Sequence, residues 1–370
     1  MNKMFLCLIL ALLSLSGCGS TANTNAPVAT YTSGSVFETS KNTVATIAGS
    51  PGVAGSTDAV GTAARFKLPN GIAVSADKTT LYVADYGNNT IRMINKATGA
   101  VTTLAGKAGV SGTADGIGTA ATFNGPHDIA TDGTSLYVTD STSNTIRKID
   151  IATGVVTTLA GKAGVAGPSD GTGTAATFNE PLGITTDGTN LYVTDAGNNT
   201  IRKINISTRV VTTLAGSAGS GGYLDGTGSA AAFNLPAGIT TDGTVLYVAD
   251  FNNNAIRKIV ISTGVVTTLA GSMNFYGSAD STGTGASFYG PNGITTDGTN
   301  LYVAESLNDT VRKIVISTGI VTTLAGSPAG AGSSNGAGSA ARFYFPVGIT
   351  TDGTSLYVAD ADNDTIRIIN

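Results

Sequence analysis

Short apolar runs alternate with turn residues along almost the whole chain. Within residues 71–105, the runs GIAV, LYVAD, TIRMI and VTTLA are four or five residues long and are separated by residues that favour turns. Runs of this length, rich in β-branched and aromatic residues, are typical of β-strands. No stretch shows a sustained 3.6-residue apolar period, so long helices are not expected. The pattern predicts a four-stranded antiparallel meander of about 36 residues.

This meander recurs six times at a fixed spacing. An arginine in its third run returns every 55 residues, at Arg92, Arg147, Arg202, Arg257, Arg312 and Arg367. A fixed period indicates one structural unit repeated. In LYVAD, Leu81 and Val83 point to one face and Tyr82 and Ala84 to the other, so both faces are apolar. Sheets covered on both faces must stack on one another, and six such sheets around an axis form an all-β, six-bladed β-propeller.

The two ends of the repeat region complement each other. The last copy stops at Asn370, after its third predicted strand, while residues 44–49 (VATIAG) match the fourth-strand sequence VTTLAG. We therefore expect the N-terminal strand to complete the last blade and close the ring, which also covers an otherwise open sheet edge. The predicted propeller spans residues 44–370.

The N-terminal 43 residues differ from the repeats. Lys3 precedes an apolar core over residues 4–15, which is too short to span a bilayer and is typical of a signal peptide. The following LSGC, ending at Cys18, resembles the bacterial lipobox, which implies cleavage before Cys18 and lipidation of its thiol. An ordinary secretory signal with a chance cysteine is the alternative. We expect residues 1–17 to be the signal and residues 18–43 a lipidated cysteine and flexible tether.

This N-terminus predicts a location in the cell envelope. The protein would be lipid-anchored to the outer membrane or to the outer face of the cytoplasmic membrane. Cys7 would leave with the signal, so the mature chain would have no disulfide. The net charge of -4 argues against a nucleic-acid partner, because phosphates are neutralised by clustered Lys and Arg.

The repeated motif identifies a family resemblance. Pro-x-Gly-Ile, then Leu-Tyr-Val-Ala-Asp, then Asn-x-x-Ile-Arg is similar to the NHL repeat, and the similarity covers about 330 residues. The resemblance implies a six-bladed propeller, and members of this family are mostly protein- or ligand-binding modules. A shared fold does not decide function.

Residues that recur in all six copies are interpreted as architecture. An acid seven residues before each arginine is expected to form a structural ion pair with it; these acids are Asp85, Asp140, Asp195, Asp250, Glu305 and Asp360. A loop of about 20 residues separates consecutive copies and is expected to rise on one face of the propeller. Each loop carries an Asp or Asn, interpreted as an Asx-type turn, and a phenylalanine that anchors the loop between blades.

Departures from the repeat are the first candidates for function. The second copy has His127, the only histidine, and Asp128, where the other five copies have Gly. The third copy has Glu180 before the proline, and copies one and five have Asn70 and Asn292 after it. Equivalent positions in a closed ring encircle the axis, so these five residues are candidate binding residues at one mouth of the channel. Sequence drift on an exposed rim is the alternative.

Aromatic residues gather in the loops of copies four to six. They occupy positions where the earlier copies mostly have small or polar residues, and they are Phe251, Phe275, Tyr276, Tyr289, Tyr344 and Phe345. Exposed aromatic side chains on one face favour a protein, peptide or glycan partner. Extra packing within the loops is the alternative.

Two functions remain open from the sequence. The first is a monomeric binding or scaffolding module, in which no residue is assigned a catalytic role and no cofactor is needed. The alternative is a calcium-dependent lactonase, since some six-bladed propellers have this activity; Asn70, Asp128, Glu180 and Asn292 would then supply the ligands. A zinc lyase or a Ser-His-Asp triad is disfavoured because the chain has one histidine and no nucleophile elbow. An enzyme is the less favoured of the two.

Overall fold

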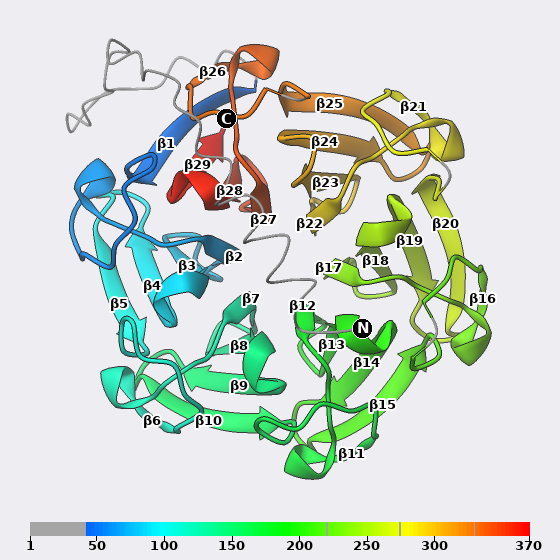
Figure 1. The fold of residues 1–370 in the computed structure, drawn as a ribbon, viewed down its shortest axis with the longest axis horizontal. Helices are drawn as coiled ribbons and strands as arrows, with labels where there is room; N and C mark the ends of the chain where they lie inside the picture. Colours follow the sequence, from blue (N-terminus) through cyan, green and yellow to red (C-terminus); the bar gives the residue numbers. More distant parts are fainter. Residues whose placement is uncertain (1–41, 220, 274, 329) are drawn as a thin grey trace. The chain divides into compact units, whose positions relative to one another are not determined.

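Each copy of the repeat forms one antiparallel sheet, and six sheets surround a central axis (Figure 1). The computed structural model describes residues 42–219, 221–273, 275–328 and 330–370, which belong to one compact unit, Thr39–Asn370. The predicted signal, Cys18 and the predicted tether up to residue 41 lie outside the described residues; Thr43, the last predicted tether residue, is the first residue of the N-terminal strand. The six-bladed, all-β propeller expected from the repeat is confirmed.

The four main strands of each blade follow one another from the channel to the outer edge. Blades are numbered by the repeat copy that supplies the innermost strand. From inside to outside they are β2 (Pro69–Val74), β3 (Thr80–Asp85), β4 (Thr90–Asn95) and β5 (Val101–Ala105) in blade 1; β7 (Pro126–Thr131), β8 (Ser135–Asp140), β9 (Thr145–Asp150) and β10 (Val155–Ala160) in blade 2; β12 (Pro181–Thr186), β13 (Asn190–Asp195), β14 (Thr200–Asn205) and β15 (Val210–Ala215) in blade 3; β17 (Pro236–Thr241), β18 (Val245–Asp250), β19 (Ala255–Val260) and β20 (Val265–Gly271) in blade 4; β22 (Pro291–Thr296), β23 (Asn300–Glu305), β24 (Thr310–Val315) and β25 (Ile320–Gly326) in blade 5; and β27 (Pro346–Thr351), β28 (Leu356–Asp360), β29 (Thr365–Ile369) and β1 (Thr43–Gly49) in blade 6.

The N-terminal strand closes the ring. β1 pairs antiparallel with β29, with Val44 opposite Ile369 and Gly49 opposite Thr365. The Asn42 N–H also donates to the carbonyl of Asn370 at 2.6 Å. The last blade therefore combines strands from both ends of the repeat region, as the sequence predicts.

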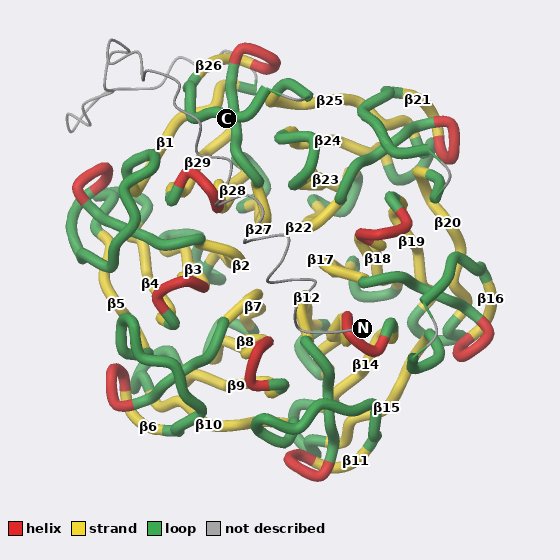
Figure 2. Tube along the Cα trace, viewed as in Figure 1, coloured by secondary structure: helices red, strands yellow, loops and turns green. Residues whose placement is uncertain are grey.

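The long loops add a feature that the repeat pattern does not predict. In blades 2 to 6 each loop contributes a two-residue strand that pairs with the outermost main strand; these strands are β6 (Gly116–Ile117), β11 (Gly171–Thr172), β16 (Gly226–Thr227), β21 (Ser281–Thr282) and β26 (Gly336–Ala337). In blade 1 the equivalent contact is the bridge between Val60 and Ala100. Each short strand leads into a 3-10 turn at the rim of the propeller (Figure 2). The loops thus cover the outer sheet edges, which would otherwise be free to pair with another chain.

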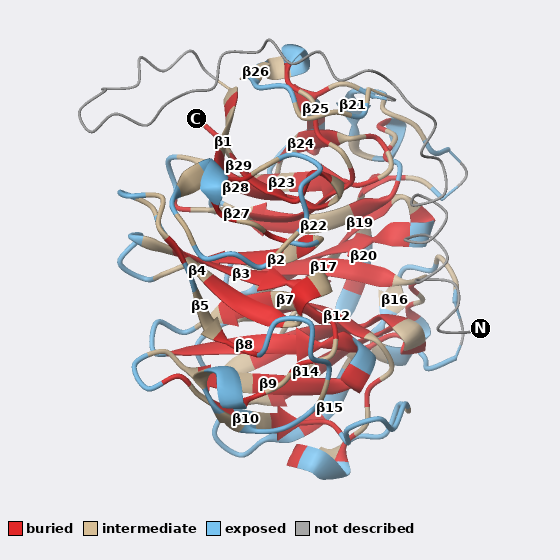
Figure 3. Ribbon diagram, turned by 60° about the vertical axis from the view of Figure 1, so that its left-hand side comes forward, coloured by how far each residue is buried: buried red, intermediate tan, exposed pale blue. Residues whose placement is uncertain are grey.

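The hydrophobic core lies between neighbouring blades. Tyr82 and Ile91 of blade 1 pack with Ile129 and Val138 of blade 2, and the loop residue Phe123 fills the space between them. The strands are buried while the connecting loops are exposed (Figure 3). This packing explains why the middle strands are apolar on both faces.

The two faces of the propeller are formed by different segments of each repeat. The loop face contains the starts of the innermost strands, the long loops and the turns between second and third strands, such as η2 (Tyr86–Asn88). The turn face contains the hairpins between first and second strands and between third and fourth strands. Asn42 lies on the turn face, because β1 runs antiparallel to β29.

Candidate functional site

A β-bulge at the start of each innermost strand aims residues at the channel. In blade 2, Pro126 pairs with Asp140 and Ile129 with Val138, so the register shifts across His127 and Asp128. The same shift occurs across Asn70 in blade 1 and Asn292 in blade 5. Bulges re-aim side chains and are enriched beside functional sites.

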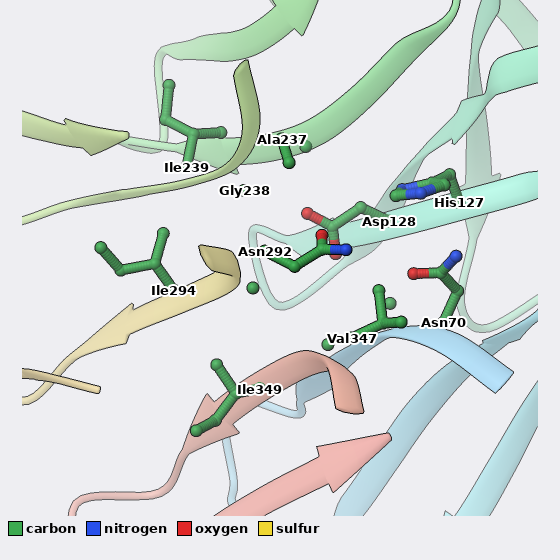
Figure 4. Close-up of a pocket in the computed structure, with 14 residues that line it drawn as sticks. Asn70, His127, Asp128, Ala237, Gly238, Ile239, Asn292, Ile294, Val347 and Ile349 are labelled. Carbon is green, nitrogen blue, oxygen red and sulfur yellow. The ribbon is translucent and has the colours of Figure 1, made fainter. Parts of the chain in front are cut away.

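The bulges meet in a narrow constriction on the loop-face side of the channel. A cavity of about 30 Å³ is lined by Asn70, His127, Asp128 and Asn292 together with glycines and apolar residues (Figure 4). The structure therefore brings together four of the five channel candidates. A cavity of this size accommodates a water molecule and no organic ligand.

Glycine is required at this bulge in most blades. A Cβ at Gly183 would collide with the carbonyl of Ala237 in the next blade, and one at Gly238 would collide with the carbonyl of Asn292. Neighbouring blades therefore approach through backbone at these points. Asp128 is the exception, and its side chain occupies the space at the junction of blades 2 and 3.

The Asp128 carboxylate is held by backbone N–H groups from two blades. It accepts hydrogen bonds from the Ile129 N–H at 2.8 Å and from the Ile184 N–H at 3.0 Å. Burial raises its pKa to about 7, although both hydrogen bonds oppose the shift. Among the described residues Asp128 has no ion-pair partner, so a carboxyl group lies in the channel without a compensating cation.

His127 is buried beside Asp128 and is neutral at pH 7. Burial lowers its pKa to about 4, and hydrogen bonding with the Leu182 backbone only partly opposes this shift. Its Nδ1 has no hydrogen-bond partner within the described part of the chain, and its ring lies edge-on to Tyr86 with centroids 6.3 Å apart.

The two asparagines of the constriction have different environments. Asn292 donates from Nδ2 to the Ser306 hydroxyl at 3.1 Å, and that hydroxyl donates to the Pro346 carbonyl at 2.7 Å. The Asn70 Oδ1 is buried without a hydrogen-bond partner among the described residues. The Asn292 side chain thus takes part in the hydrogen bonds that link blades 5 and 6, whereas the Oδ1 of Asn70 is an acceptor without a partner among the described residues.

Thr139 supports the constriction from behind Asp128 without lining it, and the sequence reasoning missed it. Its hydroxyl accepts from the Asp128 N–H at 2.9 Å and donates to the Leu182 carbonyl at 2.6 Å, so it links blades 2 and 3. Thr194 makes the equivalent link from blade 3 to Ala237 of blade 4. The sequence does distinguish these two threonines: copies two and three read LYVTD, whereas the other copies have Ala in place of Thr before the acid.

Glu180 does not join the other channel candidates. It is absent from the lining of the constriction, and its residue has φ 51°, in the left-handed region. The Glu180 N–H donates to Oδ1 of Asn144 in the preceding blade at 2.8 Å. The position before the proline is thus a backbone link between blades, and Glu180 does not line the constriction with His127 and Asp128.

The aromatic candidates divide into two groups. Phe275 and Tyr276 are each 71% exposed, and Tyr289 is 37% exposed, with its ring 5.0 Å from that of Tyr276. The sequence reasoning missed Met273, which is 48% exposed in the same loop. We call Met273, Phe275, Tyr276 and Tyr289 the aromatic loop of blade 5.

The remaining aromatic candidates do not form an exposed surface. Phe251 is 7% exposed and starts the turn η8 (Phe251–Asn253), while Phe345 is 8% exposed and precedes Pro346. Tyr344 is half-buried. The prediction of an exposed aromatic face is therefore wrong for Phe251 and Phe345, because both side chains are buried.

The repeated arginines are structural, as expected. Arg202 donates from Nη1 to Asp195 Oδ2 at 2.7 Å and from Nη2 to Asp170 Oδ1 at 2.8 Å, and its guanidinium lies over Phe178 at 5.0 Å from the ring centroid. All six arginines are fully buried. We call this arrangement the arginine clamp.

The loop acids belong to the clamp. Asp170 also accepts from the N–H and hydroxyl of Thr213 on the outermost strand, at 3.2 and 3.0 Å. These contacts tie the long loop to the outer strands, which is a different role from the expected Asx-type turn. In blade 6, Asn335 replaces the acid and accepts from Arg367 at 2.9 Å.

The constriction does not fit a calcium ion. Asp128 is the one carboxylate that lines it. Calcium takes six to eight oxygen ligands, which this set does not supply. Within residues 42–370 as described, no three His, Cys, Asp or Glu side chains gather as a metal site. The donor set therefore does not support the lactonase alternative.

A search for membrane-spanning helices gives a negative result over the described residues. None of their helices has the length and apolar character needed to cross a bilayer.

Comparison with known proteins finds relatives along most of the chain. NHL repeat-containing protein 2 of Homo sapiens is 27% identical over 340 residues, which cover 82% of this chain and 46% of the relative. Protein SUPPRESSOR OF QUENCHING 1, chloroplastic, of Arabidopsis thaliana is 29% identical over 322 residues, covering 82% of this chain and 30% of the relative. The chain thus spans less than half the length of these relatives. No family model matches the chain.

Solved structures share the fold at low sequence identity. A structural genomics protein of unknown function from Bacteroides thetaiotaomicron has a TM-score of 0.69 at 23% identity and covers 89% of this chain and 75% of its own. An auxiliary nutrient binding protein from the same species has a TM-score of 0.69 at 16% identity and covers 89% and 76%. The repeat motif, the relatives and the six-bladed fold together fit an NHL-repeat propeller.

Proposed function

We propose that the chain is a lipid-anchored, extracytoplasmic binding propeller whose loop face binds a protein, peptide or glycan partner. The aromatic loop of blade 5 is the observation that carries this proposal. Phe275 and Tyr276 expose most of their surface, and Tyr276 forms a tilted pair with Tyr289. Large aromatic side chains give contact area at low entropic cost and are enriched in binding surfaces.

The aromatic loop has no free charge to select a charged partner. Residues 272–290 contain one ionisable carboxylate, Asp280, and no Lys or Arg. Asp280 is paired with Arg312 at 2.8 Å as part of the arginine clamp. Recognition would therefore depend on ring stacking, apolar contact and hydroxyl groups. These contacts suit a glycan or an uncharged peptide segment and do not suit a polyanion.

The described part of the predicted tether joins the propeller on the face opposite the aromatic loop. Asn42 lies on the turn face, where its N–H bonds to Asn370 at the end of β29. The auxiliary nutrient binding protein has the same fold, and its name is consistent with a binding role.

The proposal is tested by capture of partners from envelope fractions of the source cells. Purified propeller is compared with the double variant Tyr276→Ala/Tyr289→Ala, and captured molecules are identified by mass spectrometry after crosslinking. Ile117→Ala is the matched control, because Ile117 is an apolar side chain at the rim of blade 2 that is 64% exposed, close to the 71% of Tyr276. We expect the double variant to lose a partner that the control retains. Equal capture by all three proteins would contradict the proposal.

A further inference from the structure

The central channel widens from the constriction toward the turn face. The opening on the turn face is a cavity of about 570 Å³, and it shares Val74, Thr131 and Thr186 with a cavity of about 190 Å³ in the middle of the channel. The middle cavity in turn shares Asp128 with the constriction of about 30 Å³. We call the two wider cavities the funnel. Its volume lies in the range of small-molecule sites, about 300–1,000 Å³.

The wall of the funnel is apolar in its deep part and hydroxylated above it. Each blade contributes one isoleucine to the deep wall, at Ile72, Ile129, Ile184, Ile239, Ile294 and Ile349. Threonines such as Thr131 and Thr186 follow toward the rim. The apolar body of a ligand would therefore lie against the six isoleucines of the deep wall.

The floor of the funnel carries Asp128. Its carboxylate lines the middle cavity and the constriction, and five other blades have glycine at this position. The repeat architecture therefore does not need an acid here. Asp128 lies three residues along β7 from Thr131 at the rim, a depth of about 10 Å. An acid buried without a cation is costly, and an incoming cation removes that cost.

The rim of the funnel favours a cation. Asp132, Asp297 and Asp352 line it, and Lys78 is the one basic residue among the residues that line the funnel. Asp352 is already paired with Lys96, which lies outside the lining, so Asp132 and Asp297 are the rim acids that can attract a cation. Burial would raise the pKa of Asp132, but hydrogen bonds from the Thr134 N–H and the Tyr137 hydroxyl outweigh it and lower the pKa. The rim acids therefore stay ionised near neutral pH, and a narrowing acidic entrance concentrates cations.

We propose that the funnel binds a small organic cation, an ammonium group on a short apolar chain, with the ammonium at the Asp128 carboxylate and the chain against the six isoleucines. The site is independent of the proposed partner surface, because the funnel opens on the turn face and the aromatic loop lies on the loop face. Either proposal therefore stands if the other fails.

Isothermal titration with three probes of equal chain length tests the site. Hexylamine, 1-hexanol and hexanoate are titrated into the purified propeller at pH 8. We expect hexylamine to bind at least about tenfold more tightly than 1-hexanol, about 1.4 kcal/mol, as for a charge-assisted hydrogen bond. Hexanoate should bind most weakly.

Two substitutions assign the preference to Asp128. Asp128→Gly restores the residue found in the other five blades, and Asp128→Asn keeps the side-chain shape without the charge. Both should bind hexylamine and 1-hexanol equally, whereas Glu180→Gln, outside the funnel lining, should keep the wild-type preference. The proposal is overturned if wild type binds the amine no better than the alcohol, if it binds no amine, or if the preference survives in both Asp128 variants.

Discussion

The two acids of an arginine clamp should differ in their contribution to stability. In blade 3, Arg202 is fully buried between Asp195, which is also fully buried, and Asp170, which is 49% exposed. The two ion pairs have nearly equal lengths, 2.7 and 2.8 Å. A difference between Asp195→Asn and Asp170→Asn would therefore reflect solvent exposure and not geometry.

The expected magnitudes follow from burial. Removing one partner of a buried ion pair costs about 3–5 kcal/mol, and Asp195→Asn leaves the buried Arg202 with only the half-exposed Asp170 as a charged partner. An exposed pair contributes about 0–1 kcal/mol, because water screens it. Blade 6 already has Asn335 in the place of the exposed acid, so the repeat tolerates Asp170→Asn in principle.

Urea unfolding followed by circular dichroism measures both variants against wild type. We expect Asp195→Asn to lower the free energy of unfolding by about 3–5 kcal/mol and Asp170→Asn by less than about 1 kcal/mol. Arg202→Lys is a third variant, which keeps the charge but cannot reach both acids with a planar fork. Equal losses for the two aspartates, or a larger loss for Asp170→Asn, would refute this reasoning.

Three further predictions concern the ring, the constriction and the anchor. Deleting residues 43–49 should sharply lower the melting temperature, because β29 loses its outer partner; an unchanged melt would exclude ring closure by β1. The Asp128 pKa is about 7 in the folded protein and about 3.9 in the unfolded chain. Protonation of Asp128 therefore stabilises the folded state fully below about pH 4, and this contribution is lost as pH rises through about 7. The wild-type melting temperature minus that of Asp128→Gly should therefore decrease between about pH 5 and pH 8. Both proteins contain His127, so its titration does not contribute to this difference. A difference that stays constant over this range would contradict the raised pKa. Cys18→Ser should release the protein from membrane fractions, and retention on membranes would count against lipidation.

The repeat made the fold predictable, because the strand and turn pattern of the blade occurs in six copies. Strands that are apolar on both faces indicated that the sheets stack on one another. The match of residues 44–49 to a fourth strand indicated that the N-terminal strand closes the ring. The sequence did not predict the two-residue fifth strands of blades 2 to 6, because a strand of two residues is too short to show a hydrophobic period. It also missed Lys96, which replaces an isoleucine in the equivalent turns of copies two to five and pairs with Asp352 of blade 6.

The candidate site was predictable only in part. Asn70, His127, Asp128 and Asn292 meet because equivalent bulge positions encircle the axis. Glu180 does not join them, because the residue before the proline takes a left-handed backbone conformation and lies outside the cavity lining. Likewise, sequence could not distinguish the exposed Tyr276 from the buried Phe345, since burial depends on how each loop packs against the inner turns.

Site-specific photo-crosslinking in the source cells tests the proposed binding role most directly. A photoreactive phenylalanine analogue is placed at Tyr276 in the aromatic loop or at Ala97, an exposed position on the turn face. The account predicts a discrete adduct from position 276 that disappears with Tyr289→Ala, and no such adduct from position 97. No adduct at position 276, or the same adduct from both positions, would contradict a partner surface on the loop face.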